Sequence, residues 1–114
     1  MSTIETLAIQ QLAAYNVSDL DAFVACYHED VVVYDGHEKV CQGTAAFRSR
    51  YQKMFETMEF GGEVPSRLVN GTHCVDLEHY WRIDPATGDL VEGTILVCYE
   101  LREGAIGTVR FLRD

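Results

Sequence analysis

The hydrophobic residues follow two different periods, which divide the chain into an N-terminal helical part and a C-terminal β part. The first apolar residues recur every three or four positions, at Ile4, Leu7, Ala8, Leu12 and Tyr15. Ser2 and Glu5 just before them have the spacing of a capping box, which predicts a helix over about residues 3–15. A second helix is expected directly after Asn16, because the same spacing returns at Leu20, Phe23, Val24 and Tyr27.

A short apolar strand is predicted next. Val31, Val32, Val33 and Tyr34 are β-branched or aromatic, which is typical of a strand buried on both faces, and Asp35 closes it. Residues 36–43 are polar and turn-forming, so a loop or an irregular hairpin is expected there. Thr44 suits the start of a third, amphipathic helix. The apolar residues of that helix are Phe47, Tyr51, Met54, Phe55 and Met58.

From Gly61 onward the apolar residues alternate, which predicts antiparallel strands. Asn70 and Gly71 are the strongest hairpin signal in the chain. The expected strands cover about residues 63–69, 72–83, 89–101 and 106–112. Helices followed by a meander of strands indicate one α+β domain over residues 1–114, in which the helices cover one face of a curved sheet.

Composition and charge narrow the classes of partner. A hydrophobic content of 47% supports a folded core, and a net charge of −9 disfavours nucleic acid and anionic membranes. No stretch approaches the roughly 20 apolar residues of a membrane span, and no basic segment precedes an apolar run at the N-terminus, so a cytoplasmic protein is expected. The four cysteines are widely separated and are expected to be buried free thiols.

Several short motifs, taken in order, resemble the nuclear transport factor 2-like superfamily, specifically its small SnoaL-like and steroid-isomerase-like members. The motifs are Asn16-x-x-Asp19-Leu20-Asp21, Tyr27-x-x-Asp30-Val31-Val32-Val33-Tyr34-Asp35, Gly43 followed by Arg48 and Tyr51, and Gly104-x-Ile106 before Val109-x-Phe111. The resemblance implies a cone in which a curved, mostly antiparallel sheet surrounds about three N-terminal helices and leaves a mostly apolar pocket. The family includes isomerases, cyclases, dehydratases, hydrolases and non-catalytic modules, so the fold alone does not decide the function.

Asp35 is the main candidate for chemistry. By resemblance, it stands where steroid-isomerase-like members have the aspartate that moves a proton between carbons of a ketone. Such a base needs a carboxylate in an apolar pocket, where desolvation raises its proton affinity, within hydrogen-bond reach of an acidic C–H. The apolar run before Asp35 fits that need. The alternative is a carboxylate that caps a loop and faces water.

An isomerase of this kind also needs hydrogen-bond donors for the enolate oxygen, and here the chain departs from the family pattern. By resemblance, Gln10 takes the place of a helix-one tyrosine, and Val97 lies near the place of a protonated acid. Both usual donors are therefore missing. The amide of Gln10 and the phenol of Tyr99, which shares a strand face with Val97, are the expected replacements.

Strand parity extends the predicted pocket to the strand at about residues 72–83. Its more apolar face carries Val75, Leu77, His79 and Trp81. Its other face carries Asp76, Glu78, Tyr80 and Arg82. We expect the more apolar face to meet the pocket, with His79 as a second acid or base and Trp81 as part of the wall. A histidine there is also compatible with a hydrogen-bonded core residue. From the third helix, Tyr51 and Phe55 are expected to contact substrate.

The outer face of the sheet is expected to mix charged residues with apolar ones such as Leu96. A homodimer through the sheet would bury this face, and the alternative is a solvated surface with scattered apolar residues. Metal-ligand spacing, a phosphate loop and a nucleophile elbow are all missing from the sequence, so no metal or cofactor is expected.

Two hypotheses follow for the function. The first is a SnoaL-like protein that binds a mostly apolar carbonyl compound, with Asp35 as the base of an isomerase or cyclase and Gln10, Tyr99 and His79 as orienting groups. The second is a non-catalytic module that binds a ligand or mediates dimerisation, whose cone its own bulky side chains could fill. An open pocket of several hundred cubic ångströms would favour the first. An epoxide or lactone hydrolase would need a pair of acids, and no pair stands out.

Overall fold

Three helices form at the segments that the apolar spacing predicts, in a computed structural model that describes residues 2–113. They are α1 (Ile4–Asn16), α2 (Leu20–Val24) and α3 (Thr44–Thr57). Thr3 caps α1 in place of the expected Ser2, because the Thr3 hydroxyl accepts a hydrogen bond from the Thr6 amide. Helix α2 is shorter than expected, since the chain has already entered strand β1 (Tyr27–Asp35) at Tyr27.

The strands form one sheet of six strands in the order β2-β1-β6-β5-β4-β3. The other strands are β2 (Glu38–Gln42), β3 (Phe60–Asn70), β4 (His73–Ile83), β5 (Leu90–Arg102) and β6 (Ala105–Leu112). Only β1 and β6 pair in parallel among the described strands. The hairpin at Asn70 and Gly71 is confirmed, and residues 36–43 form an irregular hairpin with a register shift after Val33.

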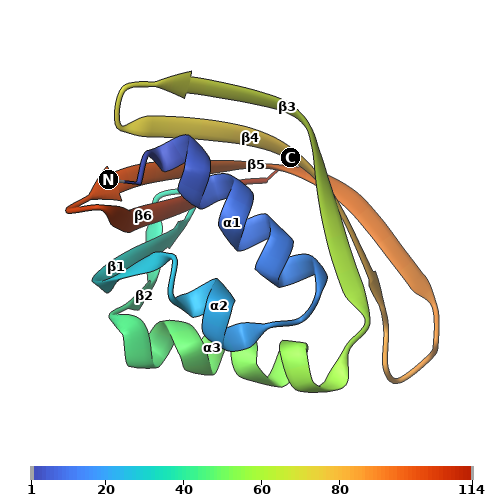
Figure 1. The fold of residues 1–114 in the computed structure, drawn as a ribbon. Helices are drawn as coiled ribbons and strands as arrows, with labels where there is room; N and C mark the ends of the chain where they lie inside the picture. Colours follow the sequence, from blue (N-terminus) through green and yellow to red (C-terminus); the bar gives the residue numbers. More distant parts are fainter. Residues whose placement is uncertain (1, 114) are drawn as a thin grey trace.

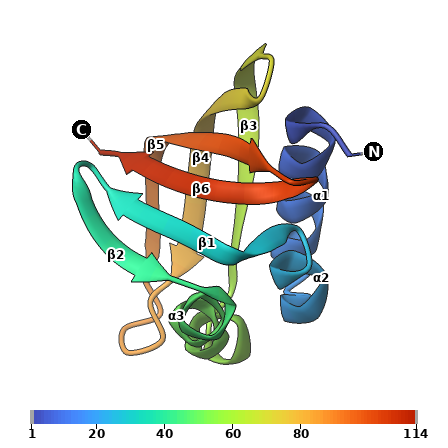
Figure 2. The same ribbon diagram turned by 90° about the vertical axis from the view of Figure 1, so that its left-hand side faces the viewer.

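The sheet curves around the helices without closing on itself, which confirms the expected cone (Figure 1). Helix α1 lies in the concave side of the sheet and contacts β3, β4, β5 and β6. Figure 2 shows β1, β2 and β6 running obliquely across the direction of β3 and β4, so twist produces the curvature. Helix α1 therefore packs against β3, β4, β5 and β6, whereas α3 contacts β1 and β2.

An aromatic cluster joins the helices to the sheet. The Phe23 ring lies at its centre, with centroid distances of 5.0–5.9 Å to five other rings. Those rings belong to Tyr15, Tyr27, Phe47, Tyr51 and Phe55. Four of these pairs are tilted or edge-on, and Phe23 and Phe47 are stacked with an interplanar angle of 16°. The cluster fixes the helices against the sheet, and part of it forms the wall of the cavity described next.

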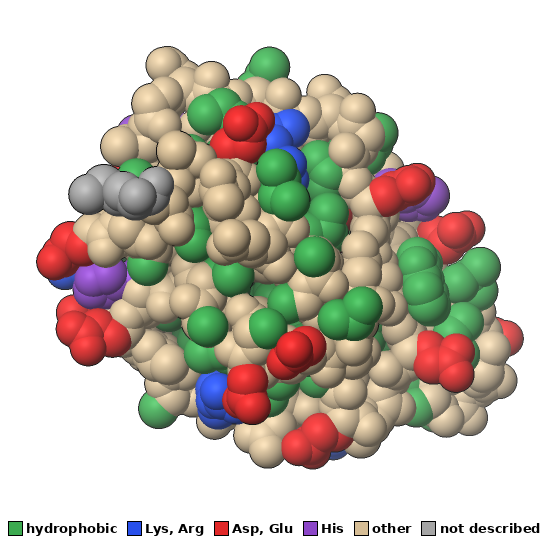
Figure 3. All heavy atoms as spheres, in the orientation of Figure 1, with side chains coloured by type: hydrophobic (Ala, Val, Ile, Leu, Met, Phe, Trp, Pro, Cys, Tyr) green, Lys and Arg blue, Asp and Glu red, His purple; other side chains and the backbone are tan. Residues whose placement is uncertain are grey.

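The surface reflects the acidic composition of the chain. Asp and Glu side chains are spread over the face in Figure 3, with few Lys and Arg side chains between them. Among the described helices, none combines the length and the apolar character that a membrane-spanning helix requires.

Candidate functional site

A cavity of about 370 Å³ opens between α1, α3 and the concave side of the sheet. This volume falls within the range of about 300–1,000 Å³ that is typical of small-molecule sites. Its apolar wall includes Phe23, Met54, Ile95, Val109 and Phe111. The cone is therefore open, and its own side chains do not fill it.

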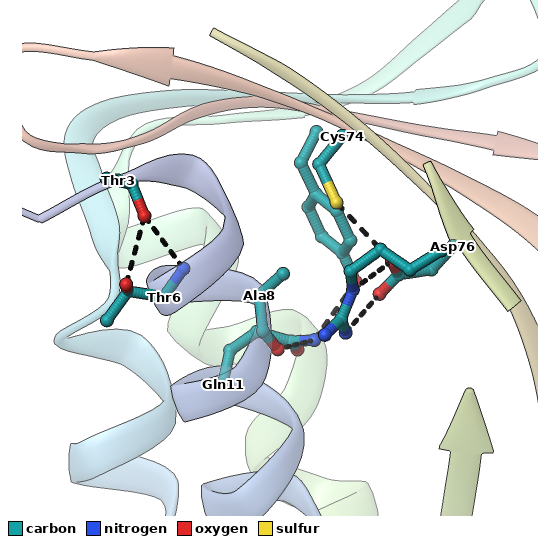
Figure 4. A network of polar contacts seen from close by, with 8 residues as sticks. Thr3, Thr6, Ala8, Gln11, Cys74 and Asp76 are labelled. Carbon is teal, nitrogen blue, oxygen red and sulfur yellow. Dashed lines mark hydrogen bonds and ion pairs between the residues drawn. The ribbon is translucent and has the colours of Figure 1, made fainter. Parts of the chain in front are cut away.

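Gln11 of α1 is buried at the cavity and joins two tyrosines. The Tyr27 hydroxyl donates to Gln11 Oε1 at 3.1 Å, and Gln11 Nε2 donates to the Tyr99 hydroxyl oxygen at 3.1 Å and to the Ala8 carbonyl at 3.1 Å. Figure 4 shows Gln11 on the side of α1 that faces Cys74 and Asp76 of the sheet. The sequence prediction for Gln10 is wrong by one residue, because Gln10 lies on the exposed face of α1.

Tyr99 has a hydroxyl proton that is free to bind a ligand. Its oxygen accepts the bond from Gln11, and in the described part of the chain no acceptor takes its own proton. Burial raises the pKa of Tyr99 well above its usual range, so the phenol stays protonated near neutral pH. Tyr99 lines the cavity, as expected, and can therefore donate to a ligand oxygen.

Among the residues that the structure describes, Glu78 is the carboxyl group that lines the cavity. Burial, with a smaller effect from the nearby Asp76 charge, raises the pKa of Glu78 from 4.5 to about 7. Its charge also contributes to the raised pKa of four surrounding phenols, those of Tyr15, Tyr27, Tyr51 and Tyr99. Among the described residues it has no ion-pair or hydrogen-bond partner. Glu78 is thus a free carboxyl group among aromatic rings, and half of it is ionised near pH 7.

The position of Glu78 depends on a glycine of the neighbouring strand. A Cβ atom at Gly62 would lie 2.7 Å from Glu78 Oε1. The carboxyl group therefore lies directly over the β3 backbone, in space that a larger residue would occupy. The Asn16 side chain holds this part of β3 against α1, because it donates to the Gly62 carbonyl at 2.9 Å and accepts from its amide at 2.8 Å.

The predicted orientation of β4 is wrong. Asp76 pairs with Val97 and Glu78 pairs with Ile95, so the even-numbered side chains of β4 face inward. His79 lies on the outer face, where its Nδ1 is 3.3 Å from Glu63 Oε1, and Trp81 is 38% exposed there. The prediction places the more apolar face of β4 inward. It is wrong because the inward face carries the buried Asp76, whose charge is compensated by Arg67: Arg67 Nε lies 2.6 Å from Asp76 Oδ1.

Asp35 lies at the cavity mouth. Asp35 lies on the same face of β1 as the buried Val31 and Val33. Its side chain is nevertheless 40% exposed and does not line the cavity. Arg113 Nε lies 3.0 Å from Asp35 Oδ1, and Arg113 does line the cavity. Asp35 is thus neither enclosed in an apolar pocket nor fully exposed to water, and its role as a base stays a prediction.

The other expected contact residues divide between the cavity and the core. Tyr51 lines the cavity. Phe55 and Val97 are buried at 8% and 1% exposure and lie outside the cavity lining. The described residues contain no group of three or more metal-binding side chains. Cys26, Cys41 and Cys74 are buried free thiols, and Cys98 is a partly buried one.

The raised pKa of Glu78 predicts that the protein loses stability as the pH rises. The folded state binds the Glu78 proton more tightly than the unfolded state does, so the stabilisation is complete below about pH 4.5 and is lost as the pH rises to about 7. The loss should be on the order of 2 kcal/mol. Urea unfolding at several pH values should show that the Glu78→Gln variant lacks this loss, and equal pH dependence in both proteins would contradict the prediction.

Comparison with known proteins agrees with this geometry. A family model described as a SnoaL-like domain matches residues 8–108. A search of curated protein sequences finds no match to this chain. Among solved structures, an uncharacterized cystatin fold protein from Novosphingobium aromaticivorans has a TM-score of 0.89 at 23% identity, over 99% of this chain and 100% of its own.

Two further structures share the fold. The Delta 5-3-ketosteroid isomerase from Mycobacterium sp. has a TM-score of 0.87 at 14% identity, over 100% of this chain and 95% of its own. A candidate polyketide cyclase from Xanthomonas campestris has a TM-score of 0.84 at 22% identity, over 96% of this chain and 89% of its own. At these identities the structures establish the fold alone, whereas the family model covers most of the sequence. The chain therefore belongs to the SnoaL-like domain family of the nuclear transport factor 2-like superfamily.

Proposed function

We propose that the cavity binds a small, mostly apolar molecule with a carbonyl group and transfers a proton at the carbon beside it, as an isomerase or cyclase does. One observation carries the proposal: the same open cavity holds a free phenol donor, Tyr99, and a carboxyl group with a pKa of about 7, Glu78. Carbon-acid chemistry needs a base of this kind together with a donor for the enolate oxygen.

The two groups have complementary roles. The Glu78 carboxylate removes a proton from the carbon beside the carbonyl, and the electron pair moves to the carbonyl oxygen, which becomes an enolate. Tyr99 donates its free proton to that oxygen in a hydrogen bond, while Gln11 and Tyr27 hold the Tyr99 hydroxyl in place. Protonated Glu78 then returns the proton to the same or another carbon, so the reaction consumes no cofactor.

Asp35 is the alternative base, and its position limits what it can reach. It pairs with Arg113 at the mouth, so it would serve only a ligand whose reactive carbon lies at the outer end. Glu78 lies inside the cavity and has no such partner among the described residues. We therefore assign the principal proton transfer to Glu78 and keep Asp35 as the competing assignment.

The exchange of acidic C–H protons tests the function without knowledge of the natural substrate. β-Tetralone is a small aromatic ketone whose protons beside the carbonyl exchange in D₂O, which NMR follows directly. The wild-type protein should accelerate this exchange above the buffer rate, and Asp35→Asn should keep most of the acceleration. Binding without acceleration would favour the non-catalytic alternative, and a complete loss in Asp35→Asn would assign the base to Asp35.

We also propose that a second copy of the chain covers the outer face of the sheet. Leu77 pairs with Leu96, which pairs with Leu112, so these three leucines form one row across β4, β5 and β6. They are 37%, 40% and 40% exposed. The row is more apolar than expected because β4 turns its charged residues inward. An apolar row at the centre of a sheet with charged residues around it suits a self-complementary contact.

The dimer predicts a specific effect of charge in this row. Leu96→Glu should convert a dimer to a monomer in analytical ultracentrifugation, because the pair of copies would bury two uncompensated carboxylates. Val17→Glu is the matched control, since Val17 is 74% exposed between α1 and α2. A wild-type protein that stays monomeric at every concentration would contradict the dimer.

A further inference from the structure

Arg50 of α3 and Arg82 of β4 both line the cavity, and both side chains are exposed. They come from different walls, one helical and one from the sheet. We infer that the ligand carries an anionic group, with a carboxylate as the model case, which Arg50 and Arg82 bind at the mouth of the cavity. This inference rests on the proposed function and specifies its substrate class: a ketone with an acid group at one end.

The pairing of charges across the molecule supports this inference. The chain has 18 acidic and 9 basic residues, so a carboxylate partner is readily available to most cations. Four arginines have a carboxylate oxygen within 4.0 Å, namely Arg48, Arg67, Arg102 and Arg113. Arg110 instead donates to the Gly36 carbonyl and lies over the Tyr34 ring. In the described part of the chain, no carboxylate lies within 4.0 Å of Arg50 or Arg82. The Arg82 guanidinium lies over the Tyr80 ring, 5.8 Å from its centroid, so it has an aromatic neighbour but no anionic one.

The two arginines without a carboxylate partner thus occur together, in the wall of one cavity, in a protein of net charge −9. Their charges also act on tyrosines of the cavity wall. The Arg50 charge opposes the rise in the pKa of Tyr51, and the Arg82 charge opposes the rise in the pKa of Tyr15. A guanidinium group presents a planar fork of donors that matches a carboxylate, so the pair is suited to an anionic group at the entrance.

This arrangement would orient the ligand along the cavity. The acid group stays at the mouth, where solvent and the arginines share its charge. The apolar body contacts the aromatic wall, including Phe23 and Phe111. The carbonyl group is then directed inward toward Tyr99 and Glu78. A charged group placed inward instead would lie beside the Glu78 carboxylate, which would repel it.

A matched pair of probes tests the inference. We would compare β-tetralone with a carboxylate on its aromatic ring and the methyl ester of the same compound, by titration at low salt. The carboxylate should bind about tenfold more tightly than the ester, and its advantage should shrink as salt is added. Arg50→Gln and Arg82→Gln should each remove most of the preference. Lys53→Gln is the control, because it removes a cation from α3 that does not line the cavity.

The outcomes separate this inference from the proposed function. Equal affinity for the acid and the ester would overturn the anionic-ligand inference and leave the proposed function standing. A preference for the acid that survives both arginine substitutions would also overturn it. If neither compound bound, the proposed function itself would be contradicted, and the inference with it.

Discussion

Replacing Glu78 by glutamine is expected to slow the exchange of β-tetralone protons in the cavity by at least about a hundredfold. Glutamine keeps the shape of the side chain and its place over Gly62, but it cannot take a proton from carbon. Because the variant also removes a carboxyl group that burial disfavours in its ionised form, it should fold and should be more stable than wild type at pH 8. A loss of activity therefore cannot be ascribed to unfolding.

Glu63→Gln provides the matched control for this experiment. Glu63 lies on the outer face of the sheet beside His79, and its side chain is 75% exposed. It should exchange β-tetralone protons at the wild-type rate. Equal rates in wild type and Glu78→Gln would remove Glu78 from the mechanism, and Asp35 would become the leading candidate.

Replacing Arg67 by methionine is expected to lower the free energy of unfolding by about 3–5 kcal/mol. The substitution leaves the Asp76 carboxylate, which is 1% exposed, without its bidentate partner at 2.6 and 2.9 Å. The remaining contact, from Cys74 Sγ to Asp76 Oδ1 at 3.4 Å, is too weak to compensate. Urea unfolding at neutral pH measures this loss directly.

The double variant Arg67→Met with Asp76→Leu distinguishes the charge from the packing. Removal of both charges leaves no buried ion, so it should recover most of the stability that the single variant loses. A double variant as unstable as Arg67→Met would mean that the packing at this position, and not the uncompensated charge, determines the loss.

Much of the fold could be predicted because it depends on local signals. Helical spacing in α1, α2 and α3 and the hairpin at Asn70 and Gly71 each act within a few residues, and the structure confirms them. The helix cap moved by one residue, since Ser2 and Thr3 are both competent to cap. The cone itself followed from the order of motifs rather than from any single one.

The site was harder to predict because it depends on which face of β4 points inward. The number of apolar residues on each face favoured the wrong one, because the inner face carries the Asp76 carboxylate, paired with Arg67, and the Glu78 carboxyl group. The register of β4 against β5, which the turn before β5 sets, determines which face points inward. Ile83 pairs with Leu90 across it, and counting back from that pair places Asp76 opposite Val97 and Glu78 opposite Ile95. Paired residues share a face, so the side that Val97 occupies is also that of Glu78.

The prediction of the donor from α1 missed a signal that the sequence contains. The amide next to the phenol comes from Gln11, one residue beyond the predicted Gln10. A shift of one position turns a helix by about 100°, which is enough to exchange an exposed side chain for a buried one. The helical spacing of Ile4, Leu7 and Ala8 places position 11, and not position 10, on the buried face of α1, so the apolar period could have identified Gln11.

The pH dependence of β-tetralone exchange tests the central claim most directly. If Glu78 is the base, the rate should rise with pH around a midpoint near 7, where the carboxyl group ionises in the folded protein. In the Glu78→Gln variant this rise should be absent, and the exchange that remains should equal that in buffer without protein at each pH. A profile that is the same in wild type and in Glu78→Gln would contradict the claim that Glu78 transfers the proton.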